Sequence, residues 1–331
     1  MKEALFYKKL GNNTVQCVLC PHKCKIKNNA LGICLARKNI NEKLVSLSYG
    51  KITSSGMDPI EKKPLYHFYP GSQIFSIGSF GCNLKCNFCQ NYSISQISLK
   101  DAECIEISSD KLLSYVQETD SLGVAYTYNE PLINYEYVLE CAQLLKEHNY
   151  KNVFVTNGFI NNEPLESIAP FIDAVNIDLK GFSPDYYKKI CKGELDIVKD
   201  TIQILFDKNI HIELTNLLIT DLNDDLALFE QMVDWIASLS DEIPFHISRC
   251  FPAYKCTKPA TDANTLLKTF EIACKKLKYV YLGNMVTNVG NNTSCPKCGN
   301  LLIERHGYST KIVSLKKNHC SKCHTKINIL T

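Results

Sequence analysis

Short apolar runs recur along the middle of the chain, and each is followed by a longer stretch with helical spacing. An apolar period of about two residues predicts a strand, and a period of about 3.6 predicts a helix. The predicted strands are 73–79, 123–128, 152–157, 174–180, 211–219, 244–250 and 279–284. The predicted helices are 110–118, 132–148, 184–191, 197–208, 224–239 and 261–277. Strand followed by helix, repeated about six times, predicts parallel β/α units joined by right-handed crossovers.

Residues that favour helix N-termini support several of these helices. Pro184 lies near the start of one, and Asp224 and Asp225 open another. Thr261 or Asp262 is suited to cap the helix that follows them. Proline is tolerated in the first turn, and an aspartate or threonine side chain accepts hydrogen bonds from free backbone N–H groups there.

Several of the predicted strands carry polar side chains on one face only. These side chains are His211, Glu213 and Thr215 in one strand, Asn176, Asp178 and Lys180 in another, and His246 and Ser248 in a third. A sheet covered by helices on both faces would be apolar on both. The intervening helices argue against an antiparallel sheet with one wet face. We therefore expect an α/β fold with a curved, partly open barrel whose interior holds a polar ligand.

Composition sets broad limits on the class of protein. The chain has 331 residues, of which 45% are hydrophobic and 21% charged, with a net charge of +3. These values are typical of a folded protein and provide no strong attraction to nucleic acid or anionic membrane. The N-terminal text MKEALFYKKLGNN lacks the apolar core of a signal peptide, and no apolar run has membrane-spanning length. We expect a cytoplasmic protein.

The 17 cysteines fall mainly into three groups. A cytoplasmic chain keeps its thiols reduced, so the groups indicate metal sites and not disulfides. The groups are Cys17, Cys20, Cys24 and Cys34; Cys82, Cys86 and Cys89; and Cys295, Cys298, Cys320 and Cys323. The scattered cysteines are interpreted as small buried hydrophobic residues. They are Cys104, Cys141, Cys191, Cys250, Cys256 and Cys274.

The middle group lies in the stretch GCNLKCNFCQN, directly after the first predicted strand of the barrel. This is the carboxyl end of the strand, where active sites of β/α barrels gather. Three thiolates are one short of a closed structural zinc site. They can instead hold three irons of a [4Fe–4S] cluster and leave the fourth iron open to a small molecule.

This stretch, including Phe88, resembles the signature of radical S-adenosylmethionine enzymes. The resemblance extends over nearly the whole chain through CVLCPHKC, DPIEKKPLYHFYPGS, YTYNEP, VTNGF, NIDLKGF and CPKCGNLLIERHGY. These motifs look like the radical enzyme of the AmmeMemoRadiSam system, which is related to activating enzymes of pyruvate formate-lyase and other glycyl radical enzymes. The resemblance implies a partial (β/α)6 barrel and reductive cleavage of S-adenosylmethionine to methionine and a 5′-deoxyadenosyl radical.

The resemblance also implies roles for particular residues. Cys82, Cys86 and Cys89 would be the cluster ligands, and Asn129 and Glu130 would meet the methionine amino group. Lys180, beside Asp178, would neutralise its carboxylate, and His246 would meet the ribose. Phe88, Asn157 and Thr215 are assigned to the same cofactor site. Glu213, Thr215 and Arg249 are polar candidates for substrate contact that could equally be structural.

The two flanking cysteine groups divide the chain into 1–72, 73–290 and 291–331. The C-terminal group has the C-x2-C…C-x2-C spacing of a zinc ribbon. CSKCH at 320–324 also fits a haem attachment site, but that reading requires export. The ribbon is expected to add nothing to the cofactor pocket. The N-terminal four thiols, with His22 as a possible substitute, favour zinc, and an auxiliary iron–sulfur cluster stays open.

Two classes of function are consistent with these groups. One is a radical enzyme that works with AMMECR-type and Memo-type proteins and an electron donor such as flavodoxin or ferredoxin. Its substrate, protein or small molecule, is not specified by any motif. The other is a zinc-binding interaction or nucleic-acid-binding module, suggested by the terminal cysteine sets and the lysine-rich 311–326. A near-balanced charge and a cluster of three thiols with an open position favour the enzyme.

Overall fold

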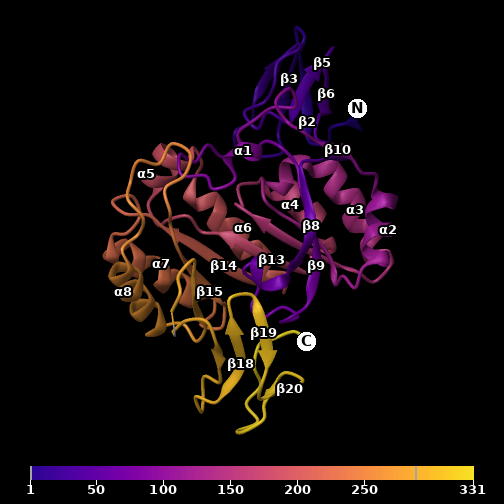
Figure 1. Cartoon of the computed structure of the whole chain (residues 1–331). Helices are drawn as coiled ribbons and strands as arrows, with labels where there is room; N and C mark the ends of the chain where they lie inside the picture. The colour runs from indigo at the N-terminus through magenta and orange to yellow at the C-terminus, as the bar shows by residue number, and fades with distance from the viewer. Residues whose placement is uncertain (1, 288) are drawn as a thin grey trace.

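The computed structural model describes residues 2–287 and 289–331, and its centre is an eight-stranded sheet. The strand order is β16-β15-β14-β13-β12-β11-β9-β8 (Figure 1). All neighbouring strands from β9 to β16 are parallel, and β8 is antiparallel to β9. The strands are β8 Ser54–Pro59, β9 Gln73–Gly78, β11 Gly123–Tyr126, β12 Lys151–Thr156, β13 Ala174–Asp178, β14 His211–Leu218, β15 Phe245–Arg249 and β16 Val280–Gly283. Each predicted strand is confirmed, and the parallel order of β9 to β16 is the one that the pattern predicts, whereas the antiparallel strand β8 was not predicted.

Helices follow most of the parallel strands and pack on one face of the sheet. The α-helices are α1 Tyr92–Ser95, α2 Ser109–Glu118, α3 Tyr135–Glu147, α4 Asn162–Ile168, α5 Pro184–Tyr186, α6 Leu195–Asp207, α7 Leu226–Leu239 and α8 Ala263–Cys274. The other helical turns are η1 Ile60–Lys62, η2 Pro131–Asn134, η3 Ala169–Phe171 and a π-helical turn η4 Tyr187–Cys191. The predicted helix at 184–191 is therefore α5 followed by η4, and α4 was not predicted.

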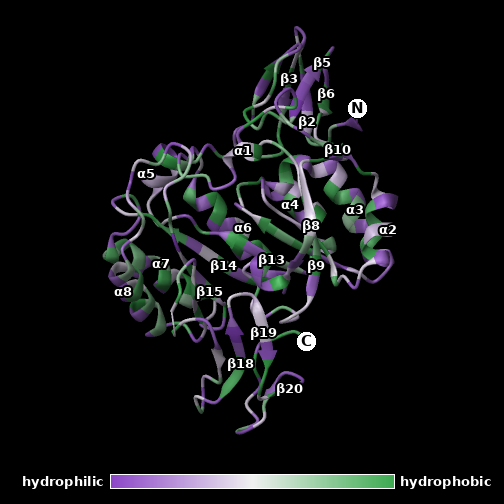
Figure 2. Cartoon of the chain, viewed as in Figure 1, coloured by the Kyte–Doolittle hydropathy of each residue, from purple (hydrophilic) through white to green (hydrophobic). Residues whose placement is uncertain are grey.

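Two helix caps form as expected. The Asp225 side chain accepts a hydrogen bond from the Leu228 N–H (2.9 Å), and Asp262 accepts one from the Thr265 N–H (3.0 Å). In Figure 2, α3, α6 and α8 are each coloured both green and purple, as expected of helices with one buried side. The cap positions and the apolar stripe together fix where each helix starts and how it lies on the sheet.

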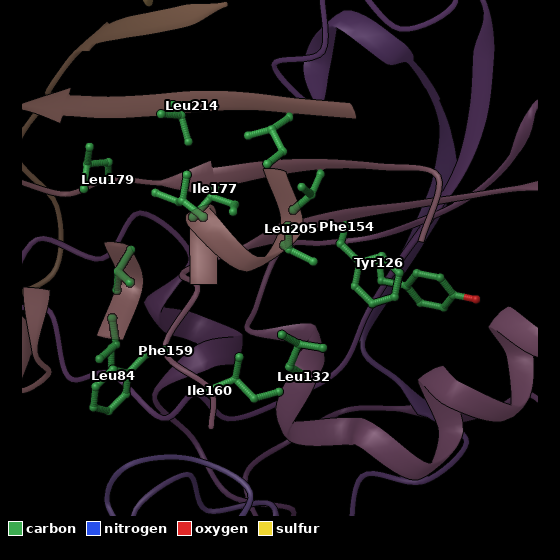
Figure 3. Packing of buried hydrophobic residues seen from close by; sticks show 14 of the residues in the cluster. Leu84, Tyr126, Leu132, Phe154, Phe159, Ile160, Ile177, Leu179, Leu205 and Leu214 are labelled. Atoms are coloured by element: carbon green, nitrogen blue, oxygen red, sulfur yellow. The ribbon is translucent and has the colours of Figure 1, made fainter. Parts of the chain in front are cut away.

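The main core lies between these helices and the sheet. Phe154, Ile177 and Leu214 from neighbouring strands pack with Leu205 of α6 and with Leu132 (Figure 3). All of these side chains are buried. This is the apolar face that the strand alternation predicts, and it leaves the polar face of β13, β14 and β15 for the barrel interior.

The barrel interior is not polar along its whole length. At the end opposite the cysteine loop, Ile60, Leu65 and Phe68 pack against Ala125 and Val153 of the strands. The segment 60–69 thus fills the end of the interior opposite the cysteine loop with apolar side chains. The expectation of an interior that holds a ligand instead of packed side chains is correct only for the carboxyl ends of the strands.

Small sheets lie at opposite ends of the central sheet in Figure 1. The N-terminal strands are β1 Lys2–Glu3, β2 Tyr7–Gly11, β3 Thr14–Cys17, β4 Lys25–Lys27, β5 Arg37–Ile40, β6 Lys43–Ser46 and β7 Lys51–Ile52, the last paired with β10 Ile105–Glu106. The C-terminal strands are β17 Thr293–Ser294, β18 Leu301–His306, β19 Ser309–Ile312, β20 Leu315–Lys316 and β21 His319–Cys320. No helix among the described residues is long and apolar enough to cross a membrane.

The N-terminal and C-terminal parts of the chain make backbone hydrogen bonds to the central sheet and to the segment 60–69 beside it. β8 lies inside the predicted 1–72 module but pairs with β9 over its whole length. At the other end of the chain, Leu330 exchanges backbone hydrogen bonds with His67 and Tyr69. The segment 60–69 is therefore held between the sheet and the C-terminal tail.

Candidate active site

A cavity of about 990 Å³ opens at the carboxyl ends of the parallel strands. Every residue that the sequence assigned to the cluster or to S-adenosylmethionine lines it. These residues are Cys82, Cys86, Phe88, Cys89, Asn129, Glu130, Asn157, Asp178, Lys180, Thr215 and His246. They come from loops and strands spread over more than half of the barrel, so their convergence is a property of the fold.

The cysteine loop leaves β9 through a tight backbone approach. Gly81 has φ +83°, and a Cβ there would lie 2.3 Å from the Cys34 carbonyl oxygen, so only glycine fits. Asn129 holds this loop: its Oδ1 accepts from the Ser79 N–H (2.9 Å) and its Nδ2 donates to the Gly81 carbonyl (3.0 Å). The Asn129 amide is thus already engaged in positioning the loop, in addition to lining the cavity.

The three thiols lie in a largely buried environment with polar neighbours. Asn157 Nδ2 lies 3.6 Å from Cys82 Sγ, and Ser95 Oγ lies 3.0 Å from Cys89 Sγ. A hydrogen bond with Cys191 and burial raise the pKa of Cys86, and burial also raises the pKa of Cys82. The free thiols are therefore neutral, and metal binding must displace their protons. Cys191 was interpreted from the sequence only as a small buried hydrophobic residue, whereas the fold places it beside Cys86.

Glu130 is a buried carboxylate that already accepts several hydrogen bonds. Its Oε1 accepts from the Leu132 N–H (3.0 Å) and the Thr156 hydroxyl (2.7 Å), and its Oε2 accepts from the Asn157 N–H (2.8 Å). Burial raises the pKa of Glu130 to about 7, although these three bonds oppose the rise. The group therefore changes charge near neutral pH, at the wall of the cavity.

Lys180 and Asp178 form an ion pair on the same wall, with Nζ and Oδ2 2.8 Å apart. Burial lowers the pKa of Lys180, but the charge and hydrogen bond of Asp178 outweigh it and raise the pKa above its usual value. The ammonium is therefore a fixed positive charge beside the cysteine loop.

His246 is held by Glu213, whose Oε2 lies 2.7 Å from His246 Nε2. Glu213 also accepts from the backbone N–H groups of Tyr66 (2.9 Å) and His67 (2.7 Å) and from His211. Burial alone would raise the pKa of Glu213, but the bonds from His211 and His246 hold it below its usual range. Glu213 does not line the cavity, so it is a structural anchor for the segment 60–69.

Arg249, the other polar candidate for substrate contact, does not line the cavity either. Its Nε donates to the Thr261 carbonyl (2.7 Å), and its guanidinium lies over the Phe251 ring. Among the substrate candidates only Thr215 lies on the wall, where its hydroxyl donates to Asn176 Oδ1 (2.9 Å).

Two groups of wall residues were not assigned a role from sequence. Lys63 lies between β8 and the cavity, pairs with Asp58 at 2.6 Å and stacks over the Tyr128 ring. The ribbon turn 305–308 forms another part of the wall. The motif DPIEKKPLYHFYPGS contains the first group and CPKCGNLLIERHGY contains the second, but neither motif indicated a place on the cavity wall. The expectation that the ribbon adds nothing to the pocket is wrong in this respect.

The four ribbon thiols converge closely. The ligand atoms of Cys295, Cys298, Cys320 and Cys323 all lie within 4.8 Å of one another. Two of the sulfur pairs are separated by 3.5 and 3.7 Å. A tetrahedral zinc site with Zn–S bonds of about 2.3 Å places its sulfurs about 3.8 Å apart. The ribbon is therefore preformed for a four-coordinate metal.

The N-terminal thiols gather differently. Cys17, Cys20, Cys24 and Cys34 surround a small cavity of about 20 Å³, and the Cys34 carbonyl oxygen lies against Gly81 of the cysteine loop. His22 lines the same small cavity, and its Nε2 lies 2.8 Å from the Asn83 carbonyl oxygen.

Comparisons with known proteins agree with this site. Residues 76–236 match the family model described as Radical SAM superfamily. The chain is 40% identical over 335 residues to "Uncharacterized protein MJ0808" of Methanocaldococcus jannaschii, with all of both chains covered. It is 24% identical over 247 residues to "Putative glycyl-radical enzyme activating enzyme MJ1632" of the same organism, covering 71% of this chain and 84% of the relative.

A solved radical SAM methyltransferase from Sphaerobacter thermophilus shares the fold. It has a TM-score of 0.53 and 14% identity, and the match covers 71% of each chain. At this identity the likeness concerns the fold alone. The chain belongs to the same family as its full-length relative MJ0808, and it is an enzyme of the radical S-adenosylmethionine superfamily.

Proposed function

We propose that the protein is the radical enzyme of an AmmeMemoRadiSam system. In this proposal it cleaves S-adenosylmethionine reductively, and the resulting 5′-deoxyadenosyl radical removes a hydrogen atom from a protein or small-molecule substrate. The observation that carries the proposal is the single cavity that collects the three cysteines and all the assigned cofactor residues. The motifs quoted above support the particular system.

The residues present fit the cluster and cofactor that a radical S-adenosylmethionine domain implies. Three thiols on one loop suit a [4Fe–4S] cluster with one open iron, and the cavity volume is at the upper end for a small-molecule site. When bound, the cluster supplies the electron that cleaves the cofactor. In the proposed complex Glu130 would face the ammonium of the cofactor and Lys180 would face its carboxylate, while His246 is oriented by Glu213.

The substrate class follows from the relatives only as a proposal. The relative named a putative glycyl-radical enzyme activating enzyme is matched over 71% of this chain, and its name supports a protein backbone glycine as the site of attack. AMMECR-type and Memo-type proteins would be partners, and a flavodoxin or ferredoxin would be the reductant. We further propose zinc in the ribbon, because the sulfur separations there match a zinc tetrahedron.

The test is anaerobic incubation of the cluster-loaded protein with a low-potential reductant and S-adenosylmethionine, with and without the two partner proteins. We expect methionine and 5′-deoxyadenosine in equal amounts, and a mass change or a radical signal on the true substrate. A protein that carries a full cluster and binds the cofactor but releases no 5′-deoxyadenosine would contradict the proposal.

The affinity for S-adenosylmethionine should rise with pH through the titration of Glu130. Its pKa is raised to about 7 by burial, so the carboxyl is mostly protonated at pH 6 and mostly ionised at pH 8. Only the ionised form attracts an ammonium, and we expect Kd to fall up to about tenfold between these pH values. Isothermal titration at several pH values measures this change.

The matched control is Glu130→Gln, which keeps the shape and removes the titration. Any pH dependence that remains in this variant belongs to the ligand or to other groups. The same slope in both proteins would remove Glu130 from the cofactor site and leave it as the cap of η2.

A further inference from the structure

The N-terminal cysteine group is spaced for something larger than one metal ion. Cys17 and Cys34 are buried, Cys20 and Cys24 are half-buried, and all four surround one small cavity. A void of about 20 Å³ remains between them. Four thiols already set at the separations of a zinc tetrahedron leave no such void, because its centre lies only about 2.3 Å from each sulfur.

The ribbon provides an internal standard for this comparison. Among the described residues, the ribbon thiols are the group whose ligand atoms all lie within 4.8 Å of one another. Neither the N-terminal four nor the Cys82, Cys86 and Cys89 set meets that spacing. The two sets thus resemble each other and differ from the ribbon, as expected if thiolates bind separate irons of a cluster instead of one shared ion.

The surroundings of the four thiols suit an anionic centre. The guanidinium of Arg37, only 1% exposed, lies 3.8 Å from Cys17 Sγ and pairs with the equally buried Glu136. Leu19, Ile26 and Ile133 complete the wall. Zinc and an oxidised [4Fe–4S] core are both dications, so charge does not distinguish them and the spacing decides.

This group touches the loop that carries the first cluster. The Cys34 carbonyl oxygen lies against Gly81, the residue before Cys82. A second connection runs from His22 Nε2 to the Asn83 carbonyl (2.8 Å), and the Asn83 side chain accepts from Asn157 Nδ2 (2.9 Å), which also faces Cys82 Sγ. Two short routes therefore join the two cysteine groups.

We propose that Cys17, Cys20, Cys24 and Cys34 hold a second [4Fe–4S] cluster that passes electrons to the cluster at Cys82, Cys86 and Cys89. A flavodoxin- or ferredoxin-type protein gives one electron to the second cluster, which is reduced from the 2+ to the 1+ state. The second cluster returns to 2+ as the first takes up the same electron, and no bond forms or breaks in this transfer. The relay, but not the cluster itself, rests on the proposed function.

The decisive protein is the triple variant Cys82→Ala, Cys86→Ala, Cys89→Ala, isolated anaerobically. We expect it to keep about four irons per chain, broad absorption at about 400 nm and a Mössbauer spectrum of a [4Fe–4S] cluster. Zinc should be about one per chain, from the ribbon. Adding Cys20→Ser should remove the iron, whereas adding Cys274→Ala, at an exposed cysteine, should not. A colourless triple variant with two zinc ions per chain would overturn the proposal.

The relay is tested on the wild-type protein by mixing with reduced flavodoxin and freezing at successive times. The triple variant supplies the reference EPR spectrum of the second cluster. We expect that signal to appear first and to decay as the signal of the first cluster rises. Reduction of the first cluster without prior appearance of the second signal would contradict the relay while leaving the cluster assignment intact. Because neither measurement requires cleavage of S-adenosylmethionine, failure here is distinct from failure of the proposed function.

Discussion

Replacing Cys86 with alanine is expected to reduce cleavage of S-adenosylmethionine to the background rate. Cys86 is the most buried of the three loop thiols, and it lies beside the Lys180 ammonium and Cys191. A cluster that loses one of the three thiolates on this loop keeps only two protein ligands, which is one fewer than a [4Fe–4S] cluster with a single open iron requires. The measurement is 5′-deoxyadenosine by chromatography after anaerobic incubation, together with the iron content.

Cys274→Ala is the matched control, because Cys274 is exposed and does not line the cavity. It should retain full activity and iron. If the N-terminal group holds a cluster, Cys86→Ala should lose about half of its iron and not all of it. Sustained 5′-deoxyadenosine formation by Cys86→Ala would remove the loop from the catalytic centre.

Breaking the ribbon with Cys298→Ser is expected to have the second-largest effect. The ribbon core is small, with Leu302, Ile303 and Ile327 packed against Tyr281 of β16. Metal binding supplies about 10–16 kcal/mol of folding free energy in small zinc modules, so loss of one thiolate should unfold the ribbon and release one metal ion.

The consequence should reach the cofactor cavity. Arg305 of the ribbon stacks on Tyr66 at 4.3 Å and donates to the Tyr66 carbonyl (2.7 Å), and Tyr66 packs edge-on against His246 at 4.7 Å. When the ribbon unfolds, Tyr66 loses its contacts with Arg305, and the position of His246 beside it becomes less fixed. We expect binding of S-adenosylmethionine to weaken about tenfold, or about 1.4 kcal/mol, while the iron of the loop cluster stays.

The sequence alone predicted the opposite, namely a ribbon that adds nothing to the cofactor pocket. Equilibrium binding and metal analysis of Cys298→Ser, compared with Lys297→Ala in the same knuckle, distinguish the two. Lys297 is exposed and contributes no ligand. If the ribbon unfolds in Cys298→Ser and the affinity for S-adenosylmethionine stays unchanged, the ribbon does not support the cofactor cavity.

Local patterns predicted much of the fold because the relevant forces are local. The alternation in β13 and β14 determines which side chains face the helices, and any parallel partner preserves that choice. The capping aspartates Asp225 and Asp262 act within one turn of their own helices. By contrast, α4 is short and contains Pro164, and η4 replaces regular helix at a position where Cys191 must reach the loop.

Site residues divide in the same way. Glu130 and Lys180 could be assigned from motifs, but their hydrogen bonds to Asn157 and Asp178 could not. Glu213 looked like a candidate for substrate contact because it shares a strand face with Thr215. The structure shows instead that Glu213 makes four hydrogen bonds inside the protein. Two hold the backbone of Tyr66 and His67 in the segment 60–69, and two join it to His211 and His246.

The sequence by itself determined the chemistry of this protein: the spacing of Cys82, Cys86 and Cys89 at the end of a strand, and the polar faces of the strands that follow. Both are encoded within a few residues. The tertiary structure alone decided what surrounds that chemistry. It placed the ribbon turn 305–308 on the cavity wall and the N-terminal cysteines against Gly81. These contacts join segments far apart in the chain, and they depend on how the whole barrel closes, which no local pattern encodes.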